Sequence, residues 1–400
     1  MSIHYQPLQS LKEGRWFKLI CGASYQHLPA IRNLALAYGL AGADCIDVAA
    51  DPAVVEAVVE AFQVISRLRQ TEELAPFTET YLPAERPLLM VSFSDGEDPH
   101  FRKAVFDAAT CPADCPRPCE AICPTAAIAF HTVLPGVIED RCYGCGRCLP
   151  VCPIQHIDTV TRATAIEAIA PQLLHKVDAV ELHTQVGRYD AFMALWATIR
   201  PYLDQLKLIS VSCPNGDDVI DYLWHIHRDI QPISIPVIWQ TDGRPMSGDI
   251  GKGTTHATIK FAQRMLQAGP PGFVQLAGGT NAHTVLKLQD LQLGPNVHST
   301  LPSGLIQQPG STQPIFGGIA YGSYARHLMS PLLDTLSFTE SESASAFANH
   351  PKAPYHATNH LETFPADLTQ AVQIAQSLIS PLKTASSSRS TQSLQQVGTP

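Results

Sequence analysis

Short apolar runs alternate with longer amphipathic segments along most of the chain. The strand-like runs, rich in β-branched and aromatic residues, number eight and cover residues 17–23, 44–49, 88–94, 179–184, 208–213, 236–241, 273–277 and 315–320. Helical periodicity, in which apolar residues recur along one face, covers residues 30–40, 52–68, 163–175, 189–206, 217–230, 256–268 and 282–291. This alternation is typical of βα units built around a parallel sheet.

Eight strands with interleaved helices predict an α/β fold with a (β/α)8 barrel-like domain. An open parallel α/β sheet accompanied by a ferredoxin domain is the alternative. If residues 163–175 form the third barrel helix, the long segment between the third strand and that helix lies on the C-terminal face of the barrel. Barrels carry their active sites on that face. If a short helix expected at residues 99–109 is the third barrel helix instead, that segment lies on the opposite face.

The pattern divides the chain into five parts. We expect the first part of the barrel at residues 1–109, a ferredoxin-like 4Fe-4S insertion at 110–158, the second part of the barrel at 159–335, a C-terminal extension with one helix at 336–383, and a disordered tail at 384–400. In the extension, residues 337–367 read as loop and residues 368–382 as an amphipathic helix. The tail is rich in Ser, Thr and Gln and has no periodicity.

Composition narrows the class of protein. The chain has 400 residues, of which 45% are hydrophobic and 16% charged, as in globular proteins. No apolar run is long enough to predict a transmembrane helix, and no signal peptide is recognised, so we expect a cytoplasmic location. A net charge of -9 without a Lys/Arg cluster argues against nucleic-acid binding.

The cysteines carry the strongest chemical pattern. Eight of the eleven lie in two runs, CPADCPRPCEAICP and CYGCGRCLPVCP. The second has the C-x2-C-x2-C-x3-C-P spacing of bacterial ferredoxins, and the first is a looser version. The candidate metal ligands are Cys111, Cys115, Cys119, Cys123, Cys142, Cys145, Cys148 and Cys152.

Two 4Fe-4S clusters are the cofactors that this pattern favours. In two-cluster ferredoxins the Cys before Pro binds the cluster of the other run. The predicted groups are therefore Cys142, Cys145 and Cys148 with Cys123, and Cys111, Cys115 and Cys119 with Cys152. Disulfides are disfavoured in a reducing compartment, and zinc prefers paired C-x2-C knuckles with a long spacer.

Glycine-rich stretches after the last two strands are a candidate phosphate site, because barrels often bind phosphate there. A flavin or another phosphate-bearing ligand is the expected occupant. The alternative is that the glycines only allow the chain to turn. The candidate cofactor-binding residues are Gly278, Gly279, Thr280, Gly322, Ser323 and Arg326.

Polar residues at or near the ends of other strands are expected to face the same pocket. They are Lys18, Asp47, Glu181, His183, Gln240 and Asp242. A barrel mouth is polar whether or not it performs chemistry, so the catalytic residues stay unknown.

The two cysteine runs, extended to CPADCPRPCEAICPTAAI and CYGCGRCLPVCPIQHI, resemble those of the cyanobacterial light-dependent period A (LdpA) family. The resemblance continues in WFKLICGASYQHLPAIRNLALAYGLAGADCIDVAADP, GFVQLAGGTNAHTV and IFGGIAYGSYAR, and reaches about residue 335. It implies an iron-sulfur protein that conveys cellular redox state and light intensity to the circadian clock and modulates its period. The clock protein KaiA and an input histidine kinase are the implied partners, and only the eight cysteines carry over by position.

Three functions follow from these observations. The first is a redox sensor whose clusters exchange electrons with a pool such as a quinone. The second is an oxidoreductase, dependent on the clusters and on a flavin, that passes electrons to a substrate in a barrel pocket. The third is a structural subunit of an electron-transfer complex. Whether the chain is an enzyme is left open, and the resemblance favours the sensor.

Overall fold

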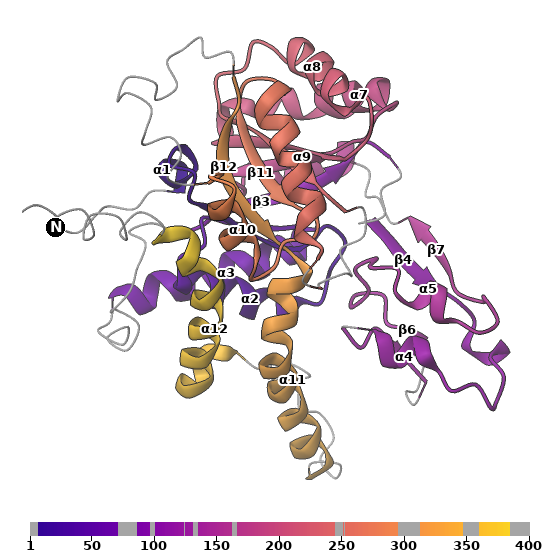
Figure 1. Cartoon of the computed structure of the whole chain (residues 1–400). Coiled ribbons are helices and arrows are strands. Elements are labelled where there is room, and N and C mark those ends of the chain that lie inside the picture. Colours follow the sequence, from indigo (N-terminus) through magenta and orange to yellow (C-terminus); the bar gives the residue numbers. More distant parts are fainter. Residues whose placement is uncertain are drawn as a thin grey trace, which may run out of the picture.

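Eight parallel strands close into a barrel in the computed structural model (Figure 1). They are β1 (Trp16–Gly22), β2 (Cys45–Ala49), β3 (Leu88–Ser94), β8 (Ala179–His183), β9 (Leu208–Pro214), β10 (Val237–Asp242), β11 (Phe273–Ala277) and β12 (Ile315–Tyr321), and β12 pairs with β1 to complete the ring. The structure describes residues 7–70, 86–96, 101–123, 125–130, 135–161, 166–244, 251, 253–294, 313–346 and 360–384. The predicted (β/α)8 barrel-like fold is confirmed, and the open sheet is excluded.

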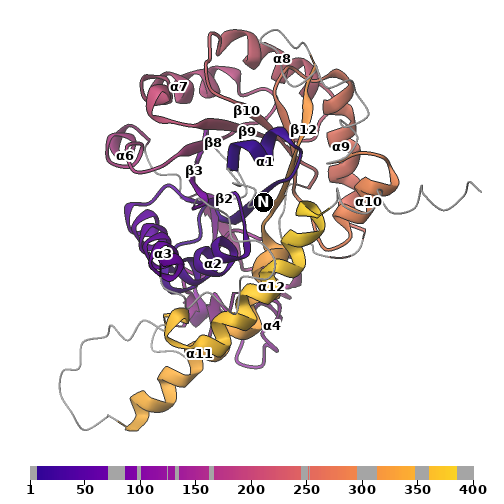
Figure 2. The same ribbon diagram turned by 90° about the vertical axis from the view of Figure 1, so that its left-hand side faces the viewer.

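Helices surround the barrel and follow its strands in turn (Figure 2). They are α2 (Leu28–Ala41), α3 (Pro52–Gln70), α6 (Ile166–Leu173), α7 (Tyr189–Ile199), α8 (Val219–Asp229), α9 (Thr255–Ala268), α10 (Thr284–Asp290) and α11 (Ser323–Ala346). The helix predicted over 189–206 is divided, because Arg200–Gln205 form a 3-10 helix that begins next to Pro201. Proline removes a backbone donor and disfavours continuation of the α-helix.

The interior of the barrel has an apolar floor and a polar upper half. The floor consists of Trp16, Cys45, Leu88, Met90, Ala179, Leu208, Ile238 and Phe273. Leu11 of α1 (Pro7–Lys12) packs against it and closes that end. Alternate residues of each strand point inward, so the residues two positions further along each strand form the layer above the floor.

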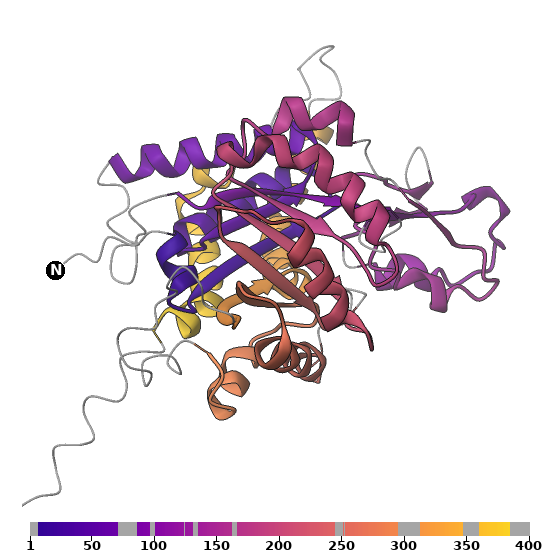
Figure 3. The ribbon, with the colours of Figure 1, turned by 90° about the horizontal axis from the view of Figure 1, so that it is seen from above.

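The segment between β3 and α6 forms a lobe that projects from the barrel (Figures 1 and 3). Its elements are β4 (Arg102–Val105), α4 (Pro118–Ile122), β5 (Ile128–Ala129), β6 (Gly136–Val137), α5 (Cys148–Val151) and β7 (Asp158–Thr161). Strand β4 pairs antiparallel with β7, so the chain enters and leaves the lobe along neighbouring strands. The lobe has its own small apolar core around Cys119, Ile128, Cys148 and Ile157.

The helix predicted at residues 99–109 is wrong where the structure describes this stretch. Residues 102–105 are strand β4, and Ala108–Thr110 make a short 3-10 turn. The strand is specified by pairing with β7, a partner far along the sequence that local periodicity does not include. Helix α6 is therefore the third barrel helix, and the lobe lies on the C-terminal face.

The C-terminal extension contains more helix than the sequence pattern predicts. Helix α11 continues to Ala346, so the loop expected from residue 337 is wrong for residues 337–346. This stretch, SFTESESASA, has helix-favouring Glu and Ala but no apolar periodicity. The predicted helix at 368–382 is confirmed as α12 (Pro365–Lys383), which packs against α2 and α11. The predicted tail, apart from Thr384, lies outside the described residues.

Candidate functional site

The eight candidate ligands all lie in the lobe, around the short helices α4 and α5. Cys119 lies in α4 and Cys148 begins α5, while Cys123 and Cys152 each follow one of these helices. Backbone amides point at three of the sulfur atoms. The distances to Sγ are 3.3 Å from Ala104 N to Cys142, 3.2 Å from Ala127 N to Cys123, and 3.3 Å from His156 N to Cys152.

The thiols interact electrostatically in two groups. The pKa values of Cys145 and Cys148 are raised by burial, and also by the neighbouring thiols of Cys142 and Cys123. The pKa values of Cys111 and Cys119 are likewise raised by burial, and also by the thiols of Cys115 in the same run and Cys152 in the other. We call the first set the proximal group (Cys123, Cys142, Cys145, Cys148) and the second the distal group (Cys111, Cys115, Cys119, Cys152).

This grouping fits iron-sulfur clusters in its donor chemistry. Thiolates held close together repel one another unless a cation neutralises their charge, and an all-thiolate set suits Fe–S ligation. Within the described ranges, no three His, Cys, Asp or Glu side chains are placed to hold a single metal ion. A cubane cluster requires a different arrangement from a single metal ion, because each thiolate binds a different iron at a corner of the cube.

The proximal group is the one nearer the barrel. Cys145 packs against the main hydrophobic core, which the barrel strands and helices build. The lobe is fastened here to the loop between β1 and α2. Buried Lys103 donates from Nζ to the carbonyl oxygens of Ser24 at 2.6 Å and Glu139 at 2.7 Å, and the backbone of Gln26 donates to Asp140 O at 3.0 Å.

Tyr143, between two candidate ligands of the proximal group, lines the cavity at the barrel mouth. It is only 7% exposed. The guanidinium carbon of Arg326 lies 4.3 Å from the centre of its ring, and burial raises the pKa of its hydroxyl. Tyr25 packs edge-on against the same ring at 6.2 Å. Sequence reasoning missed this residue, although a large aromatic beside a cluster cysteine could have indicated it.

The six predicted cofactor-binding residues all line one cavity of about 50 Å³ at the barrel mouth. Tyr143 and four of the predicted polar residues line it too: Glu181, His183, Gln240 and Asp242. A bound water needs at least about 10–15 Å³ of such space. The cavity therefore has room for a small group such as a phosphate.

Three of the six residues, Arg326, Gly278 and Gly279, are also needed for the local structure. Arg326 donates from Nη1 to the carbonyl oxygens of Ile20 at 2.6 Å and Cys21 at 3.0 Å, and so ties β1 to α11. A Cβ on Gly278 would lie 2.8 Å from Arg244 O, and one on Gly279 would lie 2.7 Å from Thr254 O. The glycines are thus required by the local packing, and phosphate binding stays a prediction.

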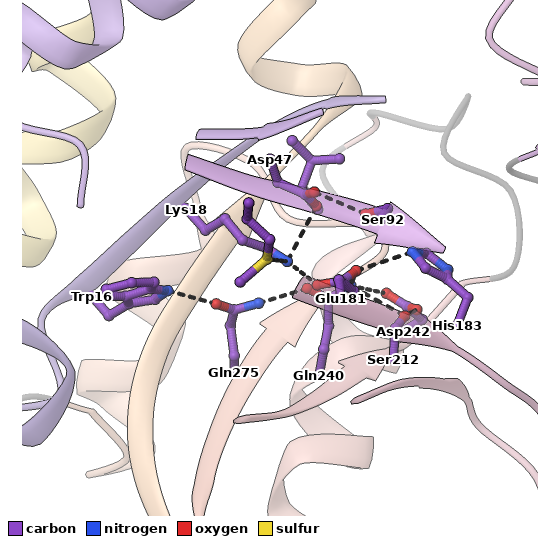
Figure 4. Close-up of polar contacts among 12 residues, drawn as sticks. Trp16, Lys18, Asp47, Ser92, Glu181, His183, Ser212, Gln240, Asp242 and Gln275 are labelled. Carbon is purple, nitrogen blue, oxygen red and sulfur yellow. Dashed lines mark hydrogen bonds and ion pairs between the residues drawn. The ribbon is translucent and has the colours of Figure 1, made fainter. Parts of the chain in front are cut away.

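The predicted polar residues meet in one buried network (Figure 4). The ammonium of Lys18 forms ion pairs with Glu181 and, at 3.4 Å, with Asp47. Glu181 Oε1 lies 3.1 Å from His183 Nε2 and accepts from Gln240 Nε2 at 2.7 Å. Side chains of five barrel strands, β1, β2, β8, β9 and β10, therefore meet around Glu181. Strand β9 contributes Ser212, which hydrogen-bonds to Asp242 of β10. The arrangement supplies a histidine oriented by a carboxylate, as in sites of proton transfer.

The two carboxylates beside Lys18 differ in their proton affinity. Burial raises the pKa of Glu181, but Lys18 and His183 outweigh burial and lower it to about 2. Burial also raises the pKa of Asp47, and here it prevails, giving about 6. Burial lowers the pKa of Lys18, yet the two carboxylates raise it above its usual value. The fixed ion pair is therefore Lys18 with Glu181, while Asp47 titrates closer to neutrality.

Sequence reasoning missed the middle of this network. Trp16 Nε1 donates to Gln275 Oε1 at 2.7 Å, and Gln275 Nε2 donates to Gln240 Oε1 at 2.5 Å. Ser92 donates to Asp47 Oδ1 at 2.8 Å. Trp16 and Gln275 lie below the strand ends, and only the inward alternation of each strand could have revealed them.

A second cavity of about 450 Å³ lies where the lobe meets the barrel. Phe101, Lys103 and Glu139 form its wall on the lobe side, and Ala23 and Ser92 line both this cavity and the smaller one. Its volume is within the range of small-molecule pockets. The sequence gave no indication of it, because its two walls come from different parts of the chain.

Known proteins resemble this chain over nearly all of its length. The protein-family model described as the LdpA Fe-S cluster-binding domain matches residues 111–163. A second family model, described as the Light dependent period A C-terminal domain, matches residues 173–381. "Light dependent period A" of Synechococcus elongatus is 48% identical over 381 residues, which are 95% of this chain and 94% of that protein.

Solved structures give weaker matches, and these support no inference. A structure of the pneumococcal exo-beta-D-N-acetylglucosaminidase StrH is 9% identical to this chain. The match covers 95% of this chain and 100% of the StrH chain, with a TM-score of 0.28. A second structure of pneumococcal StrH is 10% identical over 94% and 99% of the two chains, with a TM-score of 0.26. The relative and the two family models are decisive: the chain belongs to the light-dependent period A family, and its residues 111–163 are the iron-sulfur cluster-binding domain of that family.

Proposed function

We propose that this protein is an iron-sulfur redox sensor that conveys cellular redox state, and through it light intensity, to the circadian clock and modulates its period. The observation that carries the proposal is the set of eight thiols within the cluster-binding domain, in which Cys152 interacts with Cys111 and Cys119, and Cys123 with Cys145 and Cys148. The printed name of the 48% identical relative supports the link to a light-dependent period.

The two thiol groups would each hold one 4Fe-4S cluster in a ferredoxin-like insertion at residues 110–158. A bound cluster supplies one-electron chemistry at a potential set by its charge and surroundings. The chain supplies the thiolates and the backbone amides that donate to sulfur, such as Ala104 N and Ala127 N. Barrel segments 1–109 and 159–335 would carry the insertion, with 336–383 and 384–400 as extension and tail.

Transmission of the redox state would follow from the lobe's dependence on its metal. A domain with so small an apolar core gains much of its stability from the clusters, so a change of cluster charge or loss of iron alters its surface. We propose the clock protein KaiA and an input histidine kinase as partners in the cytoplasm, and a quinone pool as the electron partner. The described residues contain no helix able to cross a membrane.

The test is partner capture by the protein in three states: oxidised, reduced and freed of iron. Capture of KaiA or the histidine kinase should differ between states, and Cys145→Ser should shift it toward that of iron-free protein. Cys213→Ser is the matched control, because this buried cysteine lies in β9 of the barrel and not in the lobe. Equal capture by all three states would refute the sensor.

The polar barrel mouth favours a second candidate, an oxidoreductase that passes electrons from the clusters to a ligand in the barrel. The Glu181 and His183 pair borders the same cavity as Tyr143 of the lobe. In this function Gly278, Gly279, Thr280, Gly322, Ser323 and Arg326 would hold the phosphate of a flavin or another ligand. Denaturing extraction that releases a flavin or phosphorylated compound would support the oxidoreductase, and its absence from anaerobic protein would count against it.

A further inference from the structure

One side chain links the proximal group to the mouth of the barrel. Tyr143 follows Cys142 directly and belongs to the main core, against which Cys145 also packs, whereas Cys119, Ile128, Cys148 and Ile157 form a separate small core. Its ring lies over Arg326, and its Cβ lies 3.7 Å from where a Cβ on Gly22 would be. Tyr143 thus forms part of the wall of the 50 Å³ cavity from the lobe side.

Arg326, the partner of Tyr143, holds the mouth together. It lies in the first turn of α11, is 7% exposed, and donates to two carbonyl oxygens at the end of β1 and to Ser323 Oγ at 3.0 Å. A guanidinium buried against an aromatic face is stabilised by the ring, and most strongly where water is excluded. Withdrawal of the ring would expose the charge to water and weaken these bonds.

We propose that Tyr143 is a positioning residue that couples the cluster of the proximal group to the barrel mouth. With that cluster bound, the loop from Cys142 to Cys148 is held and Tyr143 closes the cavity. When the cluster is lost, the loop is released, Tyr143 leaves Arg326, and the first turn of α11 loosens. This inference rests on the proposed function, because it requires a cluster at the proximal group.

The distal group has no equivalent contact among the described residues. The corresponding aromatic–arginine pair in the lobe is Phe130 with Arg117, at 4.4 Å, and Phe130 packs in the lobe's own core. Loss of the distal cluster therefore disturbs the lobe without moving Tyr143. The two clusters are expected to differ in their effect on the barrel, and Cys145 and Cys115 provide one ligand of each for comparison.

Hydrogen exchange of backbone amides 321–328, followed by mass spectrometry, tests the coupling. The samples are the full chain with iron bound and the same chain after anaerobic chelation of iron. Chelation should speed exchange of these amides by about threefold or more, because opening of the mouth exposes them. Cys145→Ser should have the same effect without chelation, while Cys115→Ser should leave these amides as protected as in the wild type.

Variants of Tyr143 separate coupling from a general effect of unfolding. Iron-loaded Tyr143→Ala should already exchange fast and respond little to chelation, whereas Tyr143→Phe, which keeps the ring over Arg326, should restore most of the protection. Phe130→Leu is the matched control and should retain the wild-type response. If Tyr143→Ala does not bind iron, the comparison of Cys145→Ser with Cys115→Ser tests the coupling instead.

The outcomes distinguish this inference from the proposed function. Wild-type protein that binds iron and sulfide but shows the same exchange at 321–328 before and after chelation would overturn the coupling and leave the clusters intact as cofactors. Equal effects of Cys115→Ser and Cys145→Ser would overturn it as well. Wild-type protein that holds no iron and sulfide would remove the proposed function and this inference together.

Discussion

Lys18 forms ion pairs with two carboxylates, those of Glu181 and Asp47. The pKa of Glu181 is lowered, whereas the pKa of Asp47 is raised. Glu181 has the lower pKa and the additional contacts with Gln240 and His183, whereas Asp47 Oδ2 has no hydrogen-bond partner. An ion pair buried inside a barrel contributes little net stability, but the loss of one partner leaves an uncompensated charge. The two carboxylates should therefore differ sharply when each is neutralised.

Glu181→Gln is expected to lower the free energy of unfolding by about 3–5 kcal/mol, because Lys18 loses its main counter-charge in a buried site. At pH 4, where the folded protein holds Asp47 protonated, Asp47→Asn replaces one buried neutral group by another and should change stability by less than about 1 kcal/mol. Urea unfolding of the two variants beside the wild type measures both. Equal losses would contradict the assignment of Glu181 as the partner of Lys18.

Asp47 also predicts a pH dependence with a definite sign. Its pKa is raised from 3.8 to about 6 by burial, so between these values the folded state binds more protons than the unfolded chain. The contribution of Asp47 to stability is therefore full at low pH and declines as the pH rises through this window. The stability of wild type relative to Asp47→Asn should fall from pH 4 to pH 6, and a constant difference would refute the raised pKa.

Strand pairing around the barrel depends on close approach of β12 to β1. A Cβ on Gly318 would lie 2.0 Å from Trp16 O, which no side-chain movement relieves. Gly318 pairs with Trp16 at the junction where the ring closes. This contact makes the junction a sensitive place in the fold.

Gly318→Ala is expected to destabilise the protein by more than about 4 kcal/mol or to prevent folding, because the strands must separate to admit the methyl group. Gly253→Ala, where a Cβ would meet nothing within 4 Å, is the control and should be nearly neutral. Thermal unfolding followed by circular dichroism compares them. A Gly318→Ala protein as stable as the control would show that β1 and β12 do not pair this closely.

The barrel elements could be predicted from the sequence because each strand and helix is a local pattern. Strands buried on both faces read as continuous apolar runs, and their order in the chain is their order in the ring. Strand β4 could not be predicted, since its identity depends on β7. The same distinction holds for the site: cysteine spacing predicts two crossed groups, whereas Gln275 and Tyr143 gain their places only when distant segments meet.

At the scale of the molecule, the lobe and the barrel mouth form one functional region. The barrel floor is closed by α1, and α12 is fastened to that end by Lys383, which pairs with Asp44. The opposite end carries the lobe, both cavities and the polar network. The lobe contacts the barrel at its mouth, and the proposed coupling through Tyr143 acts there.

The central claim is that the lobe holds two 4Fe-4S clusters as redox centres. Its most direct test is the iron and acid-labile sulfide content of anaerobically purified protein, recorded with its visible spectrum. The account predicts about eight iron and about eight sulfide per chain, with a broad absorption that bleaches on reduction. Zinc in place of iron, or iron without sulfide, would contradict it.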